Sequence, residues 1–316
     1  MIINKPKKFG GKYSEIQKIN FEQSPEIYIV NEEPSKTYFL KLFRKDCNPK
    51  KFSYKAKIYR KLNKKENPFF LKYISDSDAE LIIREKYIVL EFAQKGSLSN
   101  YISGGNFLNE KMAKIVSWIV FKAIMFIHEL DIAYGRISIK NIYLDGNYNI
   151  KIGGLDSAKM LDNVNKNKIK EYYLKDISAL GLLLIQLLTG KDLSDSSFGN
   201  ANLVKKAISD IKKGNSKKFW EIIKMNSDYN FTLELEELIE NMFAEKISDM
   251  REILNHSWFS EISALDQKEF EKYKEELKSE FKKMEMNENN GDNYINILEV
   301  QCKYIITFSY FAGAIV

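Results

Sequence analysis

The side chains best suited to chemistry lie within residues 132–160 of this 316-residue chain. Arg136 could stabilise a phosphate charge, but its guanidinium cannot accept a proton from a hydroxyl group. Asn141 offers one neutral oxygen, which is a weak ligand for Mg²⁺ because that ion prefers carboxylates and phosphates. Asp156, near the end of the stretch, could act as a displaced metal ligand. These residue types therefore include no expected general base and no strong ligand for Mg²⁺.

The histidines and cysteines indicate no further reactive centre. His128 and His256 are the only histidines, and neither has the neighbouring Asp or Ser arrangement of acid–base catalysis, so both are expected to be structural. Cys47 and Cys302 are too few for a disulfide framework or a zinc site. We therefore expect a reducing compartment and an intracellular, cytoplasmic protein.

The elements that would position these residues begin with strands. Residues 27–30 and 38–43 have the alternating pattern of strands, and a polar turn separates them. Residues 50–63 form a basic stretch with apolar side chains at spacings of three and four, which predicts a helix. Three more strands are predicted at residues 70–74, 79–83 and 86–92.

Helices predominate after residue 94. Residues 109–130 are predicted as a long helix with one apolar face, and Asn109 is its expected N-cap. Residues 176–189 are apolar on nearly all sides, which predicts a buried helix that ends at Gly190. Shorter helices are predicted at residues 201–213, 216–226, 233–243 and 249–255. Residues 264–285 are predicted as an amphipathic helix, with an apolar stripe made of Phe270, Tyr273, Leu277, Phe281 and Met284.

Strands followed by helices predict an α+β chain, with a small β-rich lobe at residues 13–93 and a larger helical lobe at residues 94–260. Residues 1–12 would be an N-terminal segment, and residues 261–316 a C-terminal helical extension with an apolar tail. The tail, residues 304–316, is shorter than the ~20 residues that span a bilayer, so no transmembrane segment is expected there. We expect the tail to fold as a strand or helix, with peripheral membrane contact as the alternative.

The distribution of charge argues against nucleic acid as a partner. The net charge is +6, and it is carried mainly by lysines dispersed along the chain. No block of like charge typical of a nucleic-acid-binding tail is present in the sequence. We therefore expect solvated lysines on helix faces.

Four short motifs resemble motifs of protein kinases. Residues 134–141, Y-G-R-I-S-I-K-N, are similar to the catalytic loop H-R-D-x-K-x-x-N, and residues 154–156, G-L-D, stand at the place of D-F-G. Residues 176–181, D-I-S-A-L-G, are similar to the family pattern D-x-W-S-x-G, and residues 253–259, I-L-N-H-S-W-F, to I-L-x-H-P-W-F. The chain thus resembles the protein kinase superfamily, of the eukaryotic serine/threonine type. The resemblance implies a bilobal protein-kinase-like fold over residues 13–260.

The chain departs from this family at the acidic residues. Arg136 stands where the family has its catalytic Asp, and Gly154 stands where the family has its magnesium-binding Asp. Phosphoryl transfer relies on Mg²⁺ held by carboxylates, and loss of a general base typically lowers a rate by about 10²–10⁴-fold. The chain therefore resembles a pseudokinase, with no catalytic residue and no metal ligand expected.

The segment that resembles the glycine-rich phosphate loop has lost all three glycines. Asn20, Glu22 and Pro25 stand in their places. Pro25 has no amide N–H to donate, and Glu22 carries a charge of the same sign as phosphate. One carboxylate about 4 Å from a phosphate charge costs up to ~4 kcal/mol at an effective dielectric constant of 20. The position of this segment relative to Lys41 implies, by the resemblance, a nucleotide loop that has lost its glycines.

Lys41 matches the lysine of the family motif V-A-I-K, and the place of its partner glutamate is taken by Lys55, which cannot form that ion pair. Phe39 lies two residues before Lys41 and shares its face, where kinases have the alanine that leaves space for adenine. Tyr143 stands at the opposite wall, where leucine is usual. Two such rings could fill the pocket, unless either ring rotates outward. Ile27 and Leu90 complete the vestigial site.

The segment between Asp156 and Asp176 is short. Only 19 residues separate the two, and no A-P-E motif is present, so the platform for a peptide substrate is expected to be missing. The resemblance implies that Asp176 braces the backbone of the catalytic loop.

These observations predict a catalytically inactive protein with a kinase fold, acting as a scaffold or as an allosteric partner through protein–protein contacts. Neither ATP nor Mg²⁺ is expected as a cofactor, and the partner is unidentified. Candidate contact surfaces are the basic helix at residues 50–65 and the extension at residues 264–316, whose apolar stripe could dock on its own lobe or on a partner helix.

Two alternatives remain open. The chain could be a divergent serine/threonine kinase that uses ATP and Mg²⁺, with Lys41, Asn141 and Asp156 in displaced roles. It could instead bind nucleotide without transferring phosphate.

Overall fold

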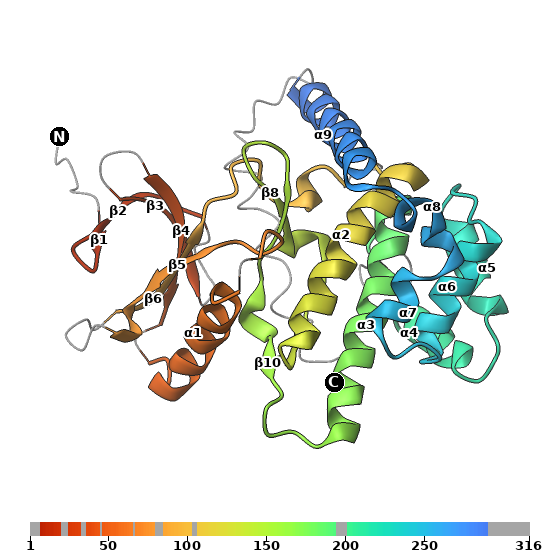
Figure 1. Cartoon of the computed structure of the whole chain (residues 1–316), viewed down its shortest axis with the longest axis horizontal. Coiled ribbons are helices and arrows are strands. Elements are labelled where there is room, and N and C mark those ends of the chain that lie inside the picture. Colours follow the sequence, from red (N-terminus) through yellow and green to blue (C-terminus); the bar gives the residue numbers. More distant parts are fainter. Residues whose placement is uncertain are drawn as a thin grey trace. The chain divides into compact units, whose positions relative to one another are not determined.

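The structure, a computed structural model, describes residues 7–19, 25–32, 36–44, 46–65, 67–79, 85–102, 106–193 and 201–289. The chain divides into two units (Figure 1). The first comprises residues 1–100, 142–156 and 291–316, and the second comprises residues 101–141 and 157–290. The described residues of the first unit are rich in strands, and those of the second are mainly helical.

The first unit is built on an antiparallel sheet of six strands in the order β1-β2-β3-β4-β6-β5 (Figure 1). Each strand pairs with its neighbour by direct antiparallel hydrogen bonding, as short alternating segments joined by turns do. The strands are β1 (Lys8–Phe9), β2 (Tyr13–Lys18), β3 (Glu26–Glu32), β4 (Lys36–Phe43), β5 (Tyr73–Asp76) and β6 (Lys86–Glu91).

The two faces of β4 carry different side chains because successive residues in a strand point to opposite sides. Leu40 and Leu42 belong to a cluster of buried apolar residues. Its other members are Phe9, Tyr13, Tyr28, Val30, Tyr87 and Val89. Phe39 and Lys41 occupy alternate positions to these, and this second face of β4 carries the candidate site.

Helix α1 (Pro49–Asn63) packs beside the sheet through an apolar face. Asn48 caps its N-terminus by accepting a hydrogen bond from the Lys50 amide, and Pro49 begins the helix, where its missing N–H costs nothing. The ring of Phe52 lies 5.2 Å from that of Phe43, centroid to centroid.

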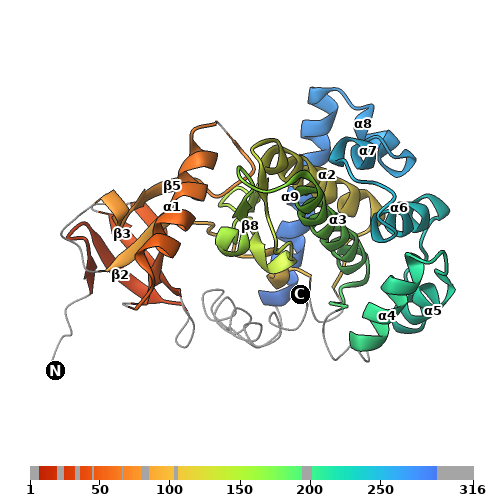
Figure 2. The ribbon, with the colours of Figure 1, turned by 90° about the horizontal axis from the view of Figure 1, so that it is seen from below.

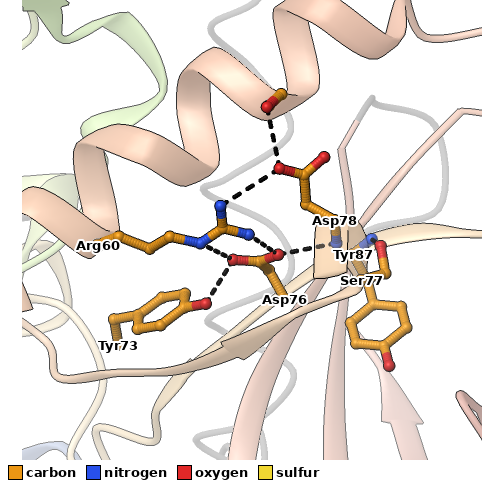
Figure 3. A network of polar contacts seen from close by, with 7 residues as sticks. Arg60, Tyr73, Asp76, Ser77, Asp78 and Tyr87 are labelled. Atoms are coloured by element: carbon orange, nitrogen blue, oxygen red, sulfur yellow. Dashed lines mark hydrogen bonds and ion pairs between the residues drawn. The ribbon is translucent and has the colours of Figure 1, made fainter. Parts of the chain in front are cut away.

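A polar network joins α1 to β5 (Figure 3). Arg60 on α1 donates two hydrogen bonds to the carboxylate of Asp76, and a third, 3.3 Å long, to Asp78. Tyr73 donates its hydroxyl to Asp76, whose side chain is fully buried. Ser53 donates to Asp78 over 2.9 Å. These hydrogen bonds therefore attach one side of α1 to β5, the strand at the edge of the sheet.

The first unit also contains a hairpin, β8 (Ile142–Leu144) and β9 (Ile150–Ile152). The amide of Leu71 donates to the carbonyl of Ile152 over 2.9 Å, and the amide of Leu144 donates to that of Gly96 over 2.8 Å. These backbone bonds tie the hairpin to the segments that flank β5 and β6.

The second unit is organised around α2 (Glu110–Glu129) and α3 (Lys166–Thr189), which lie side by side (Figure 1 and Figure 2). Asn109 and Asn165 cap them, and Gly190 ends α3 in the left-handed conformation at φ +69°. A two-stranded ribbon and six further helices complete the described part of this unit. They are β7 (Ile132–Ala133), β10 (Lys159–Met160), α4 (Ala201–Ile211), α5 (Lys217–Asn226), α6 (Leu233–Phe243), α7 (Met250–Leu254), α8 (Ser260–Ser263) and α9 (Gln267–Asn289).

Among the described residues, α3 is the helix that is long and apolar enough to cross a membrane. Of its most apolar 18-residue window, 61% is buried inside the protein. The central helix of a folded core is also long and apolar. The burial of α3 within its unit therefore explains its apolar composition.

Helix α9 docks on its own unit. Leu277 and Phe281 are buried, and the ring of Phe281 lies 5.3 Å from that of Tyr101, centroid to centroid. Lys111 on α2 forms an ion pair with Glu276. Part of the predicted apolar stripe is therefore covered by the protein itself.

The expected α+β, two-lobe class is confirmed, whereas two predicted element boundaries were wrong and a third lies mostly outside the described residues. The strand predicted at residues 70–74 is displaced: Phe70 makes only an isolated bridge to Ile152, and β5 begins at Tyr73. The strand predicted at residues 79–83 begins in a 3₁₀ turn, and its remainder lies outside the described residues. The helix predicted to start at residue 176 starts at Lys166, because Asn165 supplies an earlier cap. The predicted domain boundaries remain predictions.

Candidate functional site

Lys41 is the centre of the candidate site in the first unit. It lies on β4 in register with Ile27 of β3, and its side chain is buried. Its ammonium group donates a hydrogen bond to Oδ2 of Asp156 over 2.6 Å and another to the Tyr59 hydroxyl over 3.4 Å. Lys41 comes from β4 of the sheet, Asp156 from the turn after β9, and Tyr59 from α1.

The charge on Lys41 is stable despite its burial. Burial has the largest single effect and lowers the pKa of the ammonium group, but the raising effects of Asp156, Tyr59 and Tyr143 together outweigh it and hold the pKa above its ordinary value. Lys41 is therefore protonated at neutral pH, and its charge is balanced from within the unit.

Asp156 lies in a short 3₁₀ helix, Leu155–Ser157, that follows β9. The sequence allowed it as a displaced metal ligand, and the structure shows one of its oxygens paired with Lys41. No group of three or more His, Cys, Asp or Glu side chains that could hold a metal ion occurs in the described part of the chain.

The residue of α1 that touches Lys41 is Tyr59, one helical turn after Lys55. Lys55 is half-buried, with its ammonium group 5.6 Å from the centre of the Phe43 ring. Burial lowers the pKa of Lys55, and the positive charge of Lys41 acts in the same direction, while Asp156 opposes both. The positive charge of Lys41 thus disfavours the charge on Lys55, as expected where a lysine stands in place of the partner glutamate.

Three aromatic rings lie together beside the ion pair. Phe39 is 7% exposed, and its ring centroid lies 4.8 Å from that of Phe92 and 6.1 Å from that of Tyr143. Tyr143 rests against Gly153, where an added Cβ would approach the ring to within 2.7 Å. Glycine at this position therefore makes room for the tyrosine ring.

The Tyr143 hydroxyl is within electrostatic reach of the ion pair. Burial raises the pKa of Tyr143, while the positive charge of Lys41 lowers it and the negative charge of Asp156, a smaller effect, raises it. Leu90 lies opposite Phe39 in the β4–β6 register and is buried. The rings, the leucine and the ion pair thus form one continuous, mostly apolar group.

Of the predicted phosphate loop, Asn20 and Glu22 lie outside the described residues. Pro25 is half-buried and directly precedes β3.

The loop that resembles a catalytic loop belongs to the second unit. The buried carboxylate of Asp176 accepts hydrogen bonds from the Tyr134 amide over 2.8 Å and from the Gly135 amide over 2.7 Å. Nε2 of His128 lies 2.8 Å from the same carboxylate. Gly135 has φ +81°, and an added Cβ would lie 2.8 Å from the Ser157 carbonyl oxygen. Asp176 and this glycine together define the path of the loop.

Arg136 and Asn141 occupy this loop. The side chain of Arg136 is exposed, and its backbone carbonyl accepts a hydrogen bond from the Asn141 amide nitrogen over 3.0 Å. Asn141 thus bonds the loop backbone, the structural role expected for it. The guanidinium at position 136 offers donors and no acceptor.

Sequence reasoning missed two residues of the site. Tyr59 lies four residues after Lys55, so the same helical periodicity could have placed it on the face toward β4. Phe92 follows β6 and lies two residues beyond Leu90. Phe92 could have been found from Leu90, because residues two apart in an extended segment share a face.

The sequence is similar to protein kinases over most of its length. A model of the protein kinase domain family matches residues 27–259. A cell cycle serine/threonine-protein kinase of Saccharomyces cerevisiae, CDC5/MSD2, is 27% identical over 124 residues, covering 33% of this chain and 18% of the yeast protein. The serine/threonine-protein kinase GIN4 of the same yeast is 26% identical over 190 residues, covering 54% and 16%.

The serine/threonine-protein kinase SIK1 of Rattus norvegicus is 33% identical over 66 residues, covering 21% of this chain and 8% of the rat protein. The matches to these relatives thus span less than a fifth of each relative's length. The family match extends over strands of the first unit and helices of the second, and it includes Lys41, Asn141 and Asp176. This chain belongs to the protein kinase domain family.

Proposed function

We propose that this protein kinase domain does not transfer phosphate and acts as a scaffold or allosteric partner through contact with another protein. The observation that carries the proposal is the ion pair between Lys41 and Asp156, 2.6 Å long. Active kinases use this lysine to hold the α- and β-phosphates of ATP. Here its charge is already matched by a carboxylate.

Active kinases also pair this lysine with a helix glutamate, so pairing with a carboxylate does not by itself exclude a nucleotide. Here the carboxylate is that of Asp156, and a triphosphate held by Lys41 would lie close to it. Like charges about 4 Å apart repel by roughly 4 kcal/mol at an effective dielectric constant of 20. The side chain of Asp156 is 30% exposed, so solvent would relieve part of this repulsion. The repulsion that remains still disfavours binding of the nucleotide.

The aromatic rings add a steric obstacle. Kinases need space for adenine where Phe39 stands, and here Phe39 is buried against Phe92 and Tyr143. Moving two such rings would expose apolar surface on the order of 150–250 Å² each. At about 25 cal/mol per Å², that exposure costs several kcal/mol.

The residues that would perform the reaction are also replaced. Gly154 cannot ligate Mg²⁺, and Arg136 cannot accept the proton of a substrate hydroxyl. The proposal therefore includes no ATP or Mg²⁺ as cofactor. Cys47 is a free thiol, in keeping with an intracellular, cytoplasmic location, which we also propose.

A divergent serine/threonine kinase is the second candidate. The curated relatives that match are serine/threonine-protein kinases, and Lys41, Asn141 and the carboxylate of Asp156 are all present. In this alternative, Asp156 would release Lys41 and take up Mg²⁺ when nucleotide binds. Nucleotide binding without transfer is the intermediate case.

Thermal unfolding of the full chain, titrated with Mg-ATP, tests the proposal. A ligand at 100 times its dissociation constant stabilises a protein by about 2.7 kcal/mol, so a binder would show a clear rise in Tm at millimolar Mg-ATP. We expect no rise beyond that seen with Mg²⁺ alone, while an active kinase domain in the same buffer should respond.

A parallel assay with radiolabelled ATP and a generic protein substrate separates the alternatives. A Tm shift without transfer would indicate nucleotide binding alone. Label on the substrate, lost in a Lys41→Met variant, would overturn the proposal in favour of the kinase.

A further inference from the structure

Lys55 is a half-buried lysine on α1 that takes no part in the ion pair of the candidate site. Phe52 and Tyr59, three residues before it and four residues after it, lie on the same side of the helix and are buried. The Lys55 ammonium group lies 5.6 Å from the centre of the Phe43 ring, close to the limit of about 6 Å at which an aromatic ring attracts a cation. The ring therefore compensates little of the charge.

Lys55 also has no acidic partner. It forms no ion pair with any residue that the structure describes. Helix α1 contains no Asp or Glu over its whole length, Pro49–Asn63. Asp156, the carboxylate whose charge acts on Lys55, is already paired with Lys41.

Other charged groups act on Lys55 from α1, from β4 and from the segment before the helix. Burial has the largest effect and lowers the pKa of Lys55, which Asp156 raises and which Lys41 and Lys51 lower further, while Cys47 raises it slightly. The pKa therefore lies below its ordinary value. Lys51 is four residues before Lys55, the spacing at which like charges on a helix repel each other.

This environment is the one that makes a lysine reactive. A lysine amine becomes a nucleophile when it is desolvated or stands beside another cation, because both conditions favour its uncharged form. Lys55 meets both conditions, and it is exposed enough for a small reagent to reach it.

We propose that Lys55 is an acylation site, at which a small acyl thioester transfers its acyl group to Nζ. The uncharged amine attacks the carbonyl carbon of the thioester. A C–N bond forms, the C–S bond breaks, and the thiolate leaves and takes up the proton that the nitrogen loses. The product is a neutral amide, and the Phe43 ring offers an apolar surface beside it. The proposal is independent of whether the chain transfers phosphate.

Acylation fits this environment better than two alternatives. Methylation would keep the positive charge, whereas acylation removes it. A bound anion would balance the charge of Lys55, but the negative charge of Asp156 acts on the same place and would repel it.

Competitive labelling of the folded full chain tests the inference. The probe is S-acetyl-N-acetylcysteamine, a small uncharged thioester, applied at neutral pH until only part of the lysines has reacted. The chain is then unfolded and all remaining amines are labelled with deuterated acetic anhydride. The ratio of light to heavy acetyl groups at each lysine, measured by mass spectrometry, gives its relative rate.

Lys57 is the internal control, because it is exposed and lies two residues from Lys55 on the same helix. Once all lysines are blocked, trypsin cleaves after Arg44 and Arg60, so both lysines fall in one peptide and fragment ions separate them.

We expect Lys55 to react at least about twofold faster than Lys57 in the folded chain, because more of its amine is uncharged. In urea the two rates should become equal, since the effect comes from the folded environment. A smaller ratio in the folded chain, or the same ratio in urea, would overturn the inference.

Lys41→Met tests the electrostatic cause. It removes a cation and frees Asp156, so the ammonium form of Lys55 becomes more favourable and its acetylation should slow by about twofold or more. Lys57 should react as before. Lys64→Met, at an exposed lysine at the C-terminal end of α1, is the matched control and should change neither rate.

An unchanged Lys55 rate in Lys41→Met would overturn the inference, because the neighbouring charge would then not govern the reactivity. If circular dichroism shows Lys41→Met to be unfolded, Lys51→Gln replaces it, at an exposed position one turn before Lys55. There the Lys55 rate should also fall, by a smaller factor, and no fall would count against the inference in the same way.

Discussion

Lys41 and Asp156 show how a buried lysine can keep its charge by pairing with a carboxylate. A buried ion pair is weak evidence for stability, because desolvation offsets much of the attraction between the charges. Removing one partner is costly, however, because the other charge stays buried without compensation. The pair therefore makes this part of the fold sensitive to single substitutions.

Asp156→Asn should lower the free energy of unfolding by about 1–3 kcal/mol, because the Lys41 ammonium would keep only a neutral acceptor. Urea denaturation at pH 7 measures this change. The double variant Lys41→Met/Asp156→Leu, which has no charge to bury, should be more stable than Asp156→Asn. A single variant as stable as the wild type would show that the pair contributes nothing.

Tyr73 provides a test of pH dependence. Burial and the hydrogen bond donated to Asp76 raise the pKa of Tyr73 to about 12. Because this value exceeds that of ~10 in the unfolded chain, the contribution of Tyr73 to stability is complete below pH 10 and is lost as the pH rises through 12.

Tyr73→Phe should therefore be less stable than the wild type by about 1 kcal/mol at pH 8. The difference should shrink between pH 10 and pH 12, as the wild-type hydroxyl ionises. Urea denaturation of both proteins at a series of pH values measures it, and taking the difference removes the effect of other tyrosines. A difference that stays constant across this range would contradict the assignment.

At the scale of elements, α1 depends on its attachment to β5. Asp76 is fully buried and accepts hydrogen bonds from Arg60, Tyr73 and the Asp78 amide, whereas the side chain of Asp78 is 26% exposed. Two neighbouring carboxylates therefore bind the same arginine in different environments.

Asp76→Asn should destabilise the protein by about 1–3 kcal/mol, because it leaves Arg60 and Tyr73 with a neutral buried acceptor, while Arg60, 36% exposed, keeps its ion pair with Asp78. Asp78→Asn, the matched control, should cost less than about 1 kcal/mol, since exposed pairs contribute little. Thermal and urea unfolding would compare the two. Equal effects would show that burial does not govern this network.

Helix α9 offers a second test at this scale. Leu277→Ala should cost about 2–5 kcal/mol and Phe281→Ala about 3–5 kcal/mol, because each would leave a cavity in the second unit. Met286→Ala on the same helix should change stability by no more than about 0.5 kcal/mol, since Met286 is 53% exposed. If urea unfolding found the three variants alike, α9 would not be docked in solution.

The sequence predicted elements well wherever local signals agreed. β3, β4, α1 and α2 have clear periodicity, and Asn109 and Gly190 mark helix ends by capping chemistry. β5 was misplaced because the backbone next to Phe70 bonds to Ile152, a pairing between segments far apart in the chain.

The same limit applied to the candidate site. The shared face of Phe39 and Lys41 followed from the two-residue period of a strand. The pairing of Lys41 with Asp156 did not, because the two are 115 residues apart in sequence and meet only when the hairpin β8–β9 joins the sheet-rich unit. Nothing local to either residue indicates that contact.

Across the whole molecule, the positions that support a kinase fold match the family pattern, whereas the positions linked to phosphate transfer depart from it. Asp176 braces the loop backbone, and the family match runs from residue 27 to residue 259. Arg136 and Gly154 stand where the motifs that this sequence resembles have acidic residues.

Opening the aromatic group should restore part of a nucleotide site. In Phe39→Ala/Tyr143→Leu/Gly154→Asp, space for adenine and one magnesium ligand return, and Gly154 has φ +67°, which Asp tolerates better than most residues. We expect a fluorescent ADP analogue to bind this variant and not the wild type, measured at low temperature because cavities cost stability.

Phe281→Ala is the control for this variant, because it creates a cavity in the second unit and should leave nucleotide binding unchanged. Binding by the wild type as tight as by the triple variant would show that Phe39 and Tyr143 do not obstruct the site.

The internal partner of Lys41 has a consequence for the cell. Under the proposed function, in which no nucleotide binds, the folded population of this domain should be the same at low and high ATP concentrations in the cell. Complexes assembled on it would then depend on how much of the protein is made and not on the ATP concentration.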